Sequence, residues 1–328
     1  MIRIGTVGTG FVVDTFVDAV KKTGEMQITA VYSRSTENAN AFAKKHTVAK
    51  SYTDKNAFLA DPDLDFIYVA SPNSLHSEWT MAALNAGKNV FCEKPFMSTV
   101  REVEEAVALA KEKKLFLFEA VTVPHLPNYK LLREHIKDIS PIKLVQLNFS
   151  QFSSRYNAFM DGKLPNVFNP EFSGGALMDI NYYNLNFIVG LFGVPEDIKY
   201  YPNQAANGID TSGILVMRYA DFVCTAVGCK DSKSKNMVQI QGTSGYIYVP
   251  EESSRCIEFS VVTKDGEKKY NEQTVENSIY YELVDFCEIY NKKDFARRDE
   301  MLDYNLTITG LVEKARKEAG VLFAADEK

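Results

Sequence analysis

The sequence predicts an α/β protein in two parts, an N-terminal doubly wound parallel sheet and a C-terminal α+β domain with an open, mostly antiparallel sheet. Over the first 120 residues, short apolar runs alternate with segments of helical periodicity, which is typical of a parallel sheet covered by helices on both faces. Beyond residue 122, strand-like segments follow one another directly, as in antiparallel sheets. Because 328 residues suffice for two ordinary domains, we expect one at 1–122 and another at 123–328.

The elements of the first domain follow from runs that are apolar throughout, because strands buried on both faces show no polar alternation. Strands are expected at 2–7, 27–32, 66–70, 88–91 and 115–119. Helices are expected between them at 11–22, 37–46, 56–60, 77–86 and 100–113.

The second domain is expected to begin near Pro124 and to open with a helix at 128–137. Turn sequences then indicate antiparallel strand pairs. They comprise the pair 213–219 and 222–228, the turn at 242–245 and the Asp265-Gly266 hairpin.

A glycine-rich turn separates the first expected strand from the first helix. Gly8 permits a tight bend, and Gly10 lets a dinucleotide pyrophosphate approach the positive end of the helix that starts with Phe11 and Val12. Val13 stands where this fingerprint prefers glycine or alanine, and we expect its branched side chain to push helix and strand apart. The turn predicts nucleotide binding, and a plain strand-to-helix turn is the alternative.

Ser33 and Arg34 follow the second strand, where an NAD site carries an acid for the ribose hydroxyls. A hydroxyl and a guanidinium group favour the 2′-phosphate of NADP through charge-assisted hydrogen bonds. NADP is therefore the expected cofactor and NAD its alternative, while a solvated surface arginine is the purely structural interpretation.

Ser71, Pro72, Asn73 and His76 leave the third of these strands and start a helix at the edge where doubly wound sheets bind ligands. Asn73 suits a helix cap and Pro72 a strand end. His76 is interpreted either as a cofactor contact or as a hydrogen-bond partner of a neighbouring loop.

Composition excludes several classes of protein. A net charge of −6 with both signs mixed argues against nucleic-acid binding. No apolar run approaches the ~20 residues of a membrane span, and the N-terminus runs into a strand instead of a signal peptide. The five scattered cysteines lack metal-ligand spacing and favour a reduced, cytoplasmic protein without a metal site.

Four segments carry distinctive sequences: GTVGTG at 5–10, SPNSLH at 71–76, AGKNVFCEKP at 86–95 and GGALMDINYY at 174–183. In order and spacing they resemble the Gfo/Idh/MocA family of Rossmann-fold oxidoreductases, and within it the dihydrodiol and sugar dehydrogenase branch. The resemblance implies that Lys94 and Tyr183 are the catalytic pair, that Asp179 lines the substrate site, and that Glu93 lies beside the cofactor. It also implies hydride transfer between nicotinamide and a secondary alcohol or carbonyl of a small, sugar-like or cyclic polyol.

The residues themselves are consistent with this chemistry. From 176 to 192 the sequence is helical and largely apolar, yet Asp179, Tyr183 and Asn186 form a polar stripe, which is typical either of a site or of packed, locally satisfied residues. A phenol titrates near ~10 and is a poor base at neutral pH. An ammonium about 4 Å away contributes on the order of 4 kcal/mol at a dielectric of ~20, enough to lower that pKa by up to about three units. Lys94 would thus activate Tyr183.

Departures from the family pattern affect the substrate pocket. Asn181 replaces a usual glycine and Pro124 a frequent arginine, and we expect both to reshape the pocket. In the stretch that supplies substrate contacts in this branch, the candidates are Arg155, Asn166 and Phe168.

Two other functions stay open at this point. One is a non-catalytic NADP-binding regulator, which would not need the Lys94–Tyr183 pair. The other is a glycosidase that uses a nicotinamide for transient oxidation. We also expect a homodimer or higher homo-oligomer formed through the open sheet, with Val216, Phe222, Val238 and Ile240 as candidate interface residues.

Overall fold

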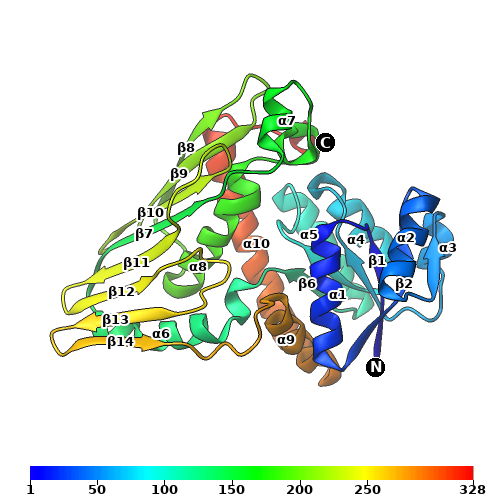
Figure 1. Ribbon diagram of the computed structural model, residues 1–328, viewed down its shortest axis with the longest axis horizontal. Coiled ribbons are helices and arrows are strands. Elements are labelled where there is room, and N and C mark those ends of the chain that lie inside the picture. Colours follow the sequence, from blue (N-terminus) through cyan, green and yellow to red (C-terminus); the bar gives the residue numbers. More distant parts are fainter. Residues whose placement is uncertain (328) are drawn as a thin grey trace. The chain divides into compact units, whose positions relative to one another are not determined.

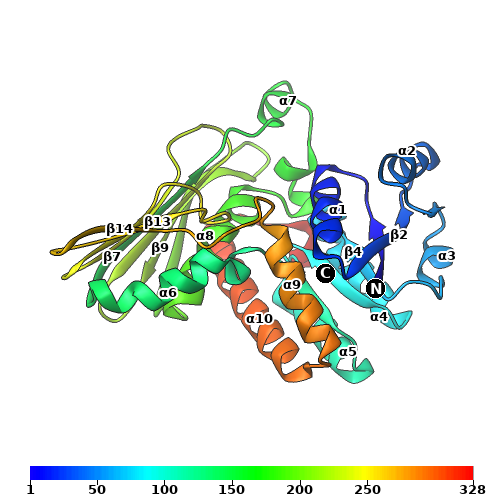
Figure 2. The same cartoon turned by 60° about the horizontal axis from the view of Figure 1, so that its bottom comes forward.

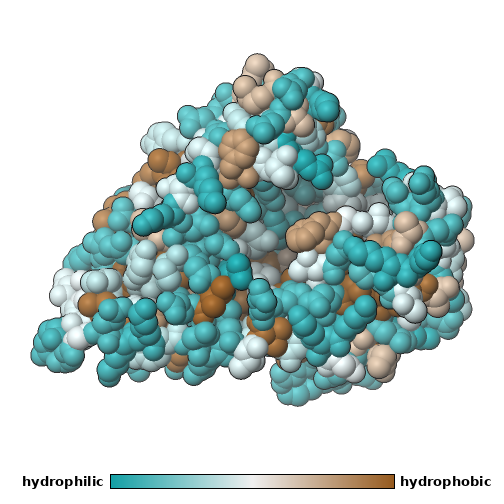
Figure 3. Space-filling view, in the orientation of Figure 1, coloured by the Kyte–Doolittle hydropathy of each residue, from teal (hydrophilic) through white to brown (hydrophobic). Residues whose placement is uncertain are grey.

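The computed structural model describes residues 1–327, which fall into two compact units. The first unit comprises Met1–Val121 and Asn277–Leu306. The second comprises Thr122–Glu276 and the residues from Thr307 onward. Among residues 1–327, no helix has both the length and the apolar composition that crossing a membrane requires. The visible surface is mainly hydrophilic, with isolated hydrophobic residues (Figure 3).

The first unit is built on a six-stranded parallel sheet with the order β3-β2-β1-β4-β5-β6 (Figure 1). Its strands are β1 (Ile2–Val7), β2 (Met26–Tyr32), β3 (Lys50–Tyr52), β4 (Phe66–Val69), β5 (Asn89–Glu93) and β6 (Leu117–Ala120). Its helices are α1 (Phe11–Thr23), α2 (Thr36–His46), α3 (Lys55–Leu59), α4 (His76–Asn85), α5 (Val100–Lys113), α9 (Ile279–Asn291) and the first part of α10 (Phe295–Glu318). The strand order reverses at β1, so the doubly wound prediction is confirmed and β1 marks the switch point where such sheets bind ligands.

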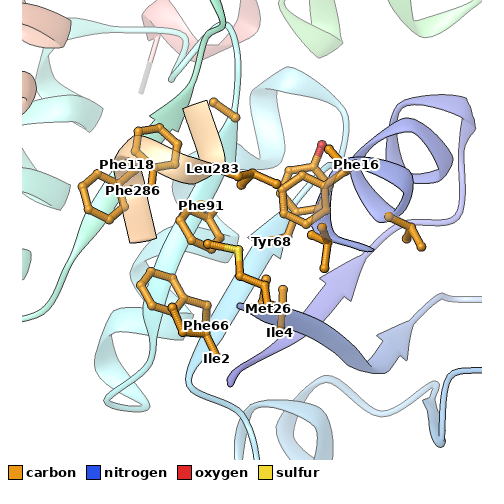
Figure 4. Close-up of a cluster of buried hydrophobic side chains, with 14 of the residues drawn as sticks. Ile2, Ile4, Phe16, Met26, Phe66, Tyr68, Phe91, Phe118, Leu283 and Phe286 are labelled. Atoms are coloured by element: carbon orange, nitrogen blue, oxygen red, sulfur yellow. The ribbon is translucent and has the colours of Figure 1, made fainter. Parts of the chain in front are cut away.

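The structure differs from the expected division in one respect, because Asn277–Leu306 belongs to the first unit instead of the second domain. The reason is hydrophobic packing by α9. Its Leu283 and Phe286 are buried in the same core as Phe91 and Phe118, and the Phe286 ring stacks on Phe118 with centroids 4.5 Å apart (Figure 4). The sheet therefore obtains one of its covering helices from a distant part of the chain.

The second unit is built on an eight-stranded sheet with the order β14-β13-β12-β11-β7-β10-β9-β8. Its strands are β7 (Ile142–Ser150), β8 (Asp197–Gln204), β9 (Asp210–Arg218), β10 (Val223–Cys229), β11 (Met237–Gly242), β12 (Gly245–Val249), β13 (Phe259–Thr263) and β14 (Gly266–Tyr270). Its α-helices are α6 (Pro127–Ile139), α7 (Tyr156–Met160), α8 (Tyr182–Phe192) and the remainder of α10. All pairings are antiparallel except that of β7 with β10, as expected for a mostly antiparallel sheet.

One face of this sheet packs against α6 and α8, which lie on the same side of it in Figure 2. Val238 and Ile240 are fully buried on that face. Their assignment to the open face is therefore wrong, because alternate residues of a strand point to opposite faces and the register places Gln239 outward instead. Val216 does lie on the open face, together with the exposed Ile214.

Candidate active site

The ends of four parallel strands in the first unit bring the predicted nucleotide residues together. Val7 is in register with Tyr32 on one side and with Val69 on the other, and Val69 is in register with Cys92. The segments after these residues therefore lie along one edge of the sheet. They carry the predicted cofactor residues Gly8, Gly10, Phe11, Val12, Ser33, Arg34, Ser71, Pro72, Asn73, Glu93 and Lys94.

The glycine turn combines one closely packed glycine with one open glycine. Gly8 has φ of 109°, and a Cβ at this position would lie 2.9 Å from the carbonyl oxygen of Ala70. Gly10 is exposed, and a Cβ there would meet no atom within 4 Å. No side chain caps the start of α1, so its first N–H groups are available to an anion at the positive end of the helix.

The first three residues of α1 differ in their exposure to solvent. Phe11 is 84% exposed and Val12 is 37% exposed, so both present apolar surface beside the glycine turn. Val13 is fully buried, and its Cγ2 atom would lie 3.8 Å from a Cβ on Gly8, which is an ordinary contact. Val13 therefore packs in the core next to the glycine turn.

Ser33 and Arg34 stand between β2 and α2 in a fixed loop. The Ser33 N–H donates to Tyr52 O at 3.1 Å, and the Ser33 Oγ atom accepts from the Ser35 N–H at 3.3 Å. Ser35 in turn caps α2 through the Asn38 N–H. Arg34 is exposed, so its guanidinium group is accessible to a phosphate.

Replacing Arg34 by alanine is expected to weaken NADPH binding about 10- to 100-fold and to leave NADH binding nearly unchanged, because only NADPH carries the 2′-phosphate. Titration calorimetry with both cofactors measures the effect, and Arg101→Ala on the exposed side of α5 is a control. Equal affinity of the wild type for both cofactors would remove Ser33 and Arg34 from cofactor selection.

His76 is placed as a support of the neighbouring loops. It is 1% exposed, with Nδ1 3.0 Å from Pro95 O and Nε2 3.0 Å from Ser71 O. Burial lowers the pKa of its imidazole, and a neutral ring donates one of these two hydrogen bonds. The ring thereby joins the loop after β4 to the loop after β5. Its prediction as a cofactor contact is corrected, since both ring nitrogens face backbone carbonyls.

Glu93 ends β5 and is buried, while the adjoining Lys94 is partly exposed. The Glu93 carboxylate accepts a hydrogen bond from the Tyr68 hydroxyl, whose ring stacks on Phe16 of α1 with centroids 3.6 Å apart. The buried hydrogen bond between Tyr68 and Glu93 therefore holds the end of β5, which carries Lys94, in place.

Glu282 of α9 is a buried carboxyl group close to this strand end. It is 1% exposed, and its Oε2 atom has no hydrogen-bond partner among the described residues. Burial and the nearby charges of Glu93 and Glu119 raise the pKa of Glu282 well above its usual range. The folded protein therefore keeps a proton that the unfolded chain releases above about pH 4.5.

Glu282→Gln is expected to stabilise the protein increasingly as pH rises. The raised pKa of Glu282 contributes fully to the free energy of unfolding below about pH 4.5. Above that pH the contribution falls by ~1.4 kcal/mol per pH unit, because the folded protein holds a proton that the unfolded chain has released. A glutamine amide does not titrate, so the variant does not lose this free energy. Urea unfolding from about pH 5 to about pH 8 measures the difference from wild type. Glu288→Gln, on the exposed side of the same helix, is the control, and a pH-independent difference for Glu282→Gln would contradict a protonated Glu282.

In the second unit, a double glycine starts the helix that carries Asp179 and Tyr183. The buried Asp210 accepts hydrogen bonds from the Leu177 N–H at 2.7 Å and the Tyr200 hydroxyl at 2.6 Å. A Cβ on Gly175 would lie 1.9 Å from Asp210 Oδ1, so only glycine admits the carboxyl group here. The chain then forms a π-helical turn, Leu177–Asn181, before α8 begins at Tyr182. Such turns occur frequently at functional sites.

The expected polar stripe on this helix is reduced to two residues. Asp179 and Tyr183 are partly exposed, and the Tyr183 ring lies 6.1 Å from that of Phe149 in β7. Asn186 is buried and donates to Tyr182 O at 2.9 Å, so it is a core residue and not part of the exposed stripe.

Asn181 faces the sheet instead of a pocket. Asn181 is 1% exposed, and its side-chain amide donates to Ala226 O at 2.9 Å. A Cβ added to Gly228 would lie 2.6 Å from the Cβ of Asn181. The asparagine therefore anchors the helix to β10, which corrects the expectation that it reshapes the pocket.

Lys230 is a candidate that sequence analysis missed. It follows β10, is 5% exposed and forms an ion pair with Asp179. Its Nζ atom also lies 5.9 Å from the centre of the Phe168 ring. No sequence motif marks this lysine, and only the pairing of β10 with its neighbours brings it to Asp179.

The three substrate-contact candidates Arg155, Asn166 and Phe168 differ in their positions in the structure. Phe168 is fully buried and joins the Lys230–Asp179 cluster, whereas Arg155 and Asn166 are exposed on the segment between β7 and the double glycine. Among residues 1–327, no group of three or more His, Cys, Asp or Glu side chains is arranged to hold a metal ion.

Comparisons with known proteins agree with these features. A family model described as an oxidoreductase family with an NAD-binding Rossmann fold matches residues 2–121. The chain is 34% identical over 335 residues to scyllo-inositol 2-dehydrogenase (NADP(+)) IolU of Bacillus subtilis (strain 168), covering 100% of both. It is 29% identical over 251 residues to the trans-1,2-dihydrobenzene-1,2-diol dehydrogenase of Sus scrofa, covering 74% of this chain and 72% of that one. The solved structure of KijD10, a 3-ketoreductase from Actinomadura kijaniata with NADP and TDP-benzene, has a TM-score of 0.86 at 20% identity, covering 98% and 99% of the two chains.

Proposed function

Since this chain belongs to the Gfo/Idh/MocA family of NAD(P)-dependent oxidoreductases, we propose that it oxidises a secondary alcohol of a cyclic polyol or sugar with NADP⁺. Its catalytic and substrate-binding residues in this proposal are Lys94, Tyr183 and Asp179. The observation that carries the proposal is the Asp179–Tyr183 stripe on an otherwise buried helix, together with Lys94 at the end of β5. The reaction is the removal of a hydride from carbon and a proton from the attached oxygen.

The residues of the first unit fit a nicotinamide dinucleotide. The open space at Gly10 and the uncapped start of α1 suit the pyrophosphate, and Arg34 suits a 2′-phosphate. The cofactor supplies the hydride acceptor at its nicotinamide ring.

The protein's contribution is to move the proton and to hold the alcohol. Tyr183 accepts the hydroxyl proton as general base and returns it during reduction. Lys94 brings positive charge to the reacting oxygen and favours the ionised phenol. Asp179 accepts a hydrogen bond from the reacting hydroxyl or from its neighbour and so orients the substrate.

The substrate class follows from the chemistry of Asp179 and from two relatives. A carboxylate suits a hydroxyl donor, and the relatives named above act on scyllo-inositol and on a cyclic trans-dihydrodiol. The test is a panel of inositols, aldoses, anhydro-sugars and trans-dihydrodiols assayed with NADP⁺ for absorbance of the reduced cofactor. Absence of NADPH formation with every member would overturn the proposal.

The same assay distinguishes the two other functions. A regulator would bind NADPH without forming it from any substrate of the panel. A glycosidase would release sugar while its nicotinamide returns to the starting state in each cycle, so stoichiometric NADPH formation excludes it.

We also propose that the protein is a cytoplasmic homodimer formed through the open sheet face. Support comes from exposed apolar residues on that face, among them Ile214 at 42%, Val223 at 41% and Tyr246 at 42% exposed, because such surface favours burial against a second copy.

Light scattering at micromolar concentration is expected to give the mass of a dimer for the wild type and that of a monomer for Ile214→Asp, because a buried unpaired charge disfavours the interface. Val194→Asp, at an exposed loop position outside this sheet, is the control and should remain dimeric. A monomeric wild type would refute the dimer.

A further inference from the structure

Lys230 is an enclosed ammonium group at a rigid position of the second unit. The backbone N–H of Lys230 donates to Thr211 O at 2.9 Å, and its backbone carbonyl oxygen accepts from the Ser153 N–H at 2.9 Å. These two hydrogen bonds tie the residue to β9 and to the segment after β7. Its Cα position is therefore determined by neighbours on both sides.

The ammonium group is directed to Asp179. Removing a cation from water is unfavourable unless an opposite charge and further contacts compensate it, and here the Asp179 carboxylate and the Phe168 ring face it. The nearby carboxylate of Asp231 binds other donors, the hydroxyls of Thr211 at 2.7 Å and Ser212 at 3.0 Å. Lys230 and Asp179 thus form an ion pair within this cluster.

The two members of the pair differ in exposure, and this difference assigns their roles. The Lys230 side chain is 6% exposed, whereas that of Asp179 is 33% exposed. A substrate hydroxyl can meet the carboxylate, but the ammonium group is covered. The influence of Lys230 on a substrate must therefore pass through Asp179.

We infer that Lys230 is a positioning residue, which holds the Asp179 carboxylate charge-paired and in one orientation toward a hydroxyl of the substrate. The inference rests on the proposed function, because it assigns to Asp179 the recognition of a polyol. It adds the residue that follows β10 to a site otherwise built from the helix after the double glycine.

Four variants test the inference: Lys230→Met, Lys230→Arg, Asp179→Asn and the double variant Lys230→Met/Asp179→Asn. Lys230→Met is expected to raise KM for the best polyol about 10- to 100-fold, with a smaller change in kcat, because a misplaced carboxylate weakens substrate orientation. NADPH affinity should stay at the wild-type level, since the nucleotide residues belong to the first unit. Lys230→Arg keeps the charge and should recover much of the loss.

The double variant separates positioning from a general structural role. It removes both charges, so it avoids the unpaired carboxylate that could destabilise Lys230→Met. If Lys230 acts through Asp179, the double variant should have the kcat/KM of Asp179→Asn within about threefold. A double variant far below Asp179→Asn would overturn the inference, as would a Lys230→Met enzyme with wild-type KM. A wild type that oxidises no polyol of the panel would instead overturn the proposed function, and the inference with it.

Discussion

Replacing Tyr183 by phenylalanine is expected to lower kcat by ~10²–10⁴-fold while folding and NADPH affinity stay at wild-type levels. The ring is retained, so its contact with Phe149 is kept, and only the proton-carrying hydroxyl is lost. Steady-state kinetics with the best substrate of the panel, thermal unfolding and cofactor titration together measure the three quantities.

Tyr201→Phe is a matched control for this prediction, because Tyr201 is 64% exposed on β8 and has no assigned part in the chemistry. Its kcat should equal that of the wild type. An unchanged kcat in Tyr183→Phe would remove Tyr183 from the mechanism. A joint loss of kcat and thermal stability would instead indicate a packed core tyrosine.

Lys94→Met is expected to cause a loss of kcat of similar size, ~10²–10⁴-fold, and its residual activity should require a more alkaline pH. The physical reason is that a nearby cation favours the ionised form of a phenol, so its removal shifts ionisation to higher pH. The pH dependence of kcat in the variant and in the wild type measures this shift.

Two further variants sharpen the Lys94 prediction. Lys94→Arg keeps the charge and should move the pH dependence less than Lys94→Met does. Lys113→Met, at an exposed position of α5, should leave kcat unchanged. A Lys94→Met enzyme with reduced kcat but an unshifted pH dependence would show that Lys94 does not assist the base, although it still serves the reaction.

Local sequence was sufficient where the determining interactions are local. The parallel sheet was predicted from continuous apolar runs, and the nucleotide turn from Gly8 and Gly10, because strand burial and backbone freedom are visible in a few neighbouring residues. The short edge strand β3, with the sequence Lys-Ser-Tyr, was not predicted, since three residues carry too little apolar periodicity.

Other errors arose where distant segments meet. His76 has two neighbouring loops as partners, and Asn181 has the carbonyl of Ala226 on β10. Pro95 lies 19 residues from His76 and Ala226 lies 45 residues from Asn181, so the pattern around each residue could not distinguish a ligand contact from a structural hydrogen bond. The orientation of Val238 and Ile240 likewise depends on strand register, which a shift of one residue reverses.

The sequence by itself determined the fold class, the family, the cofactor type and the identity of Lys94, Asp179 and Tyr183 as candidates, because each depends on short segments with strong local requirements. Only the tertiary structure decided that α9 completes the first unit, that Glu282 is buried beside other carboxyl groups, and that Lys230 pairs with Asp179. These contacts join residues tens to hundreds of positions apart. They form because hydrophobic burial and strand pairing bring the segments together, and the sequence pattern of a single segment does not predict such a contact.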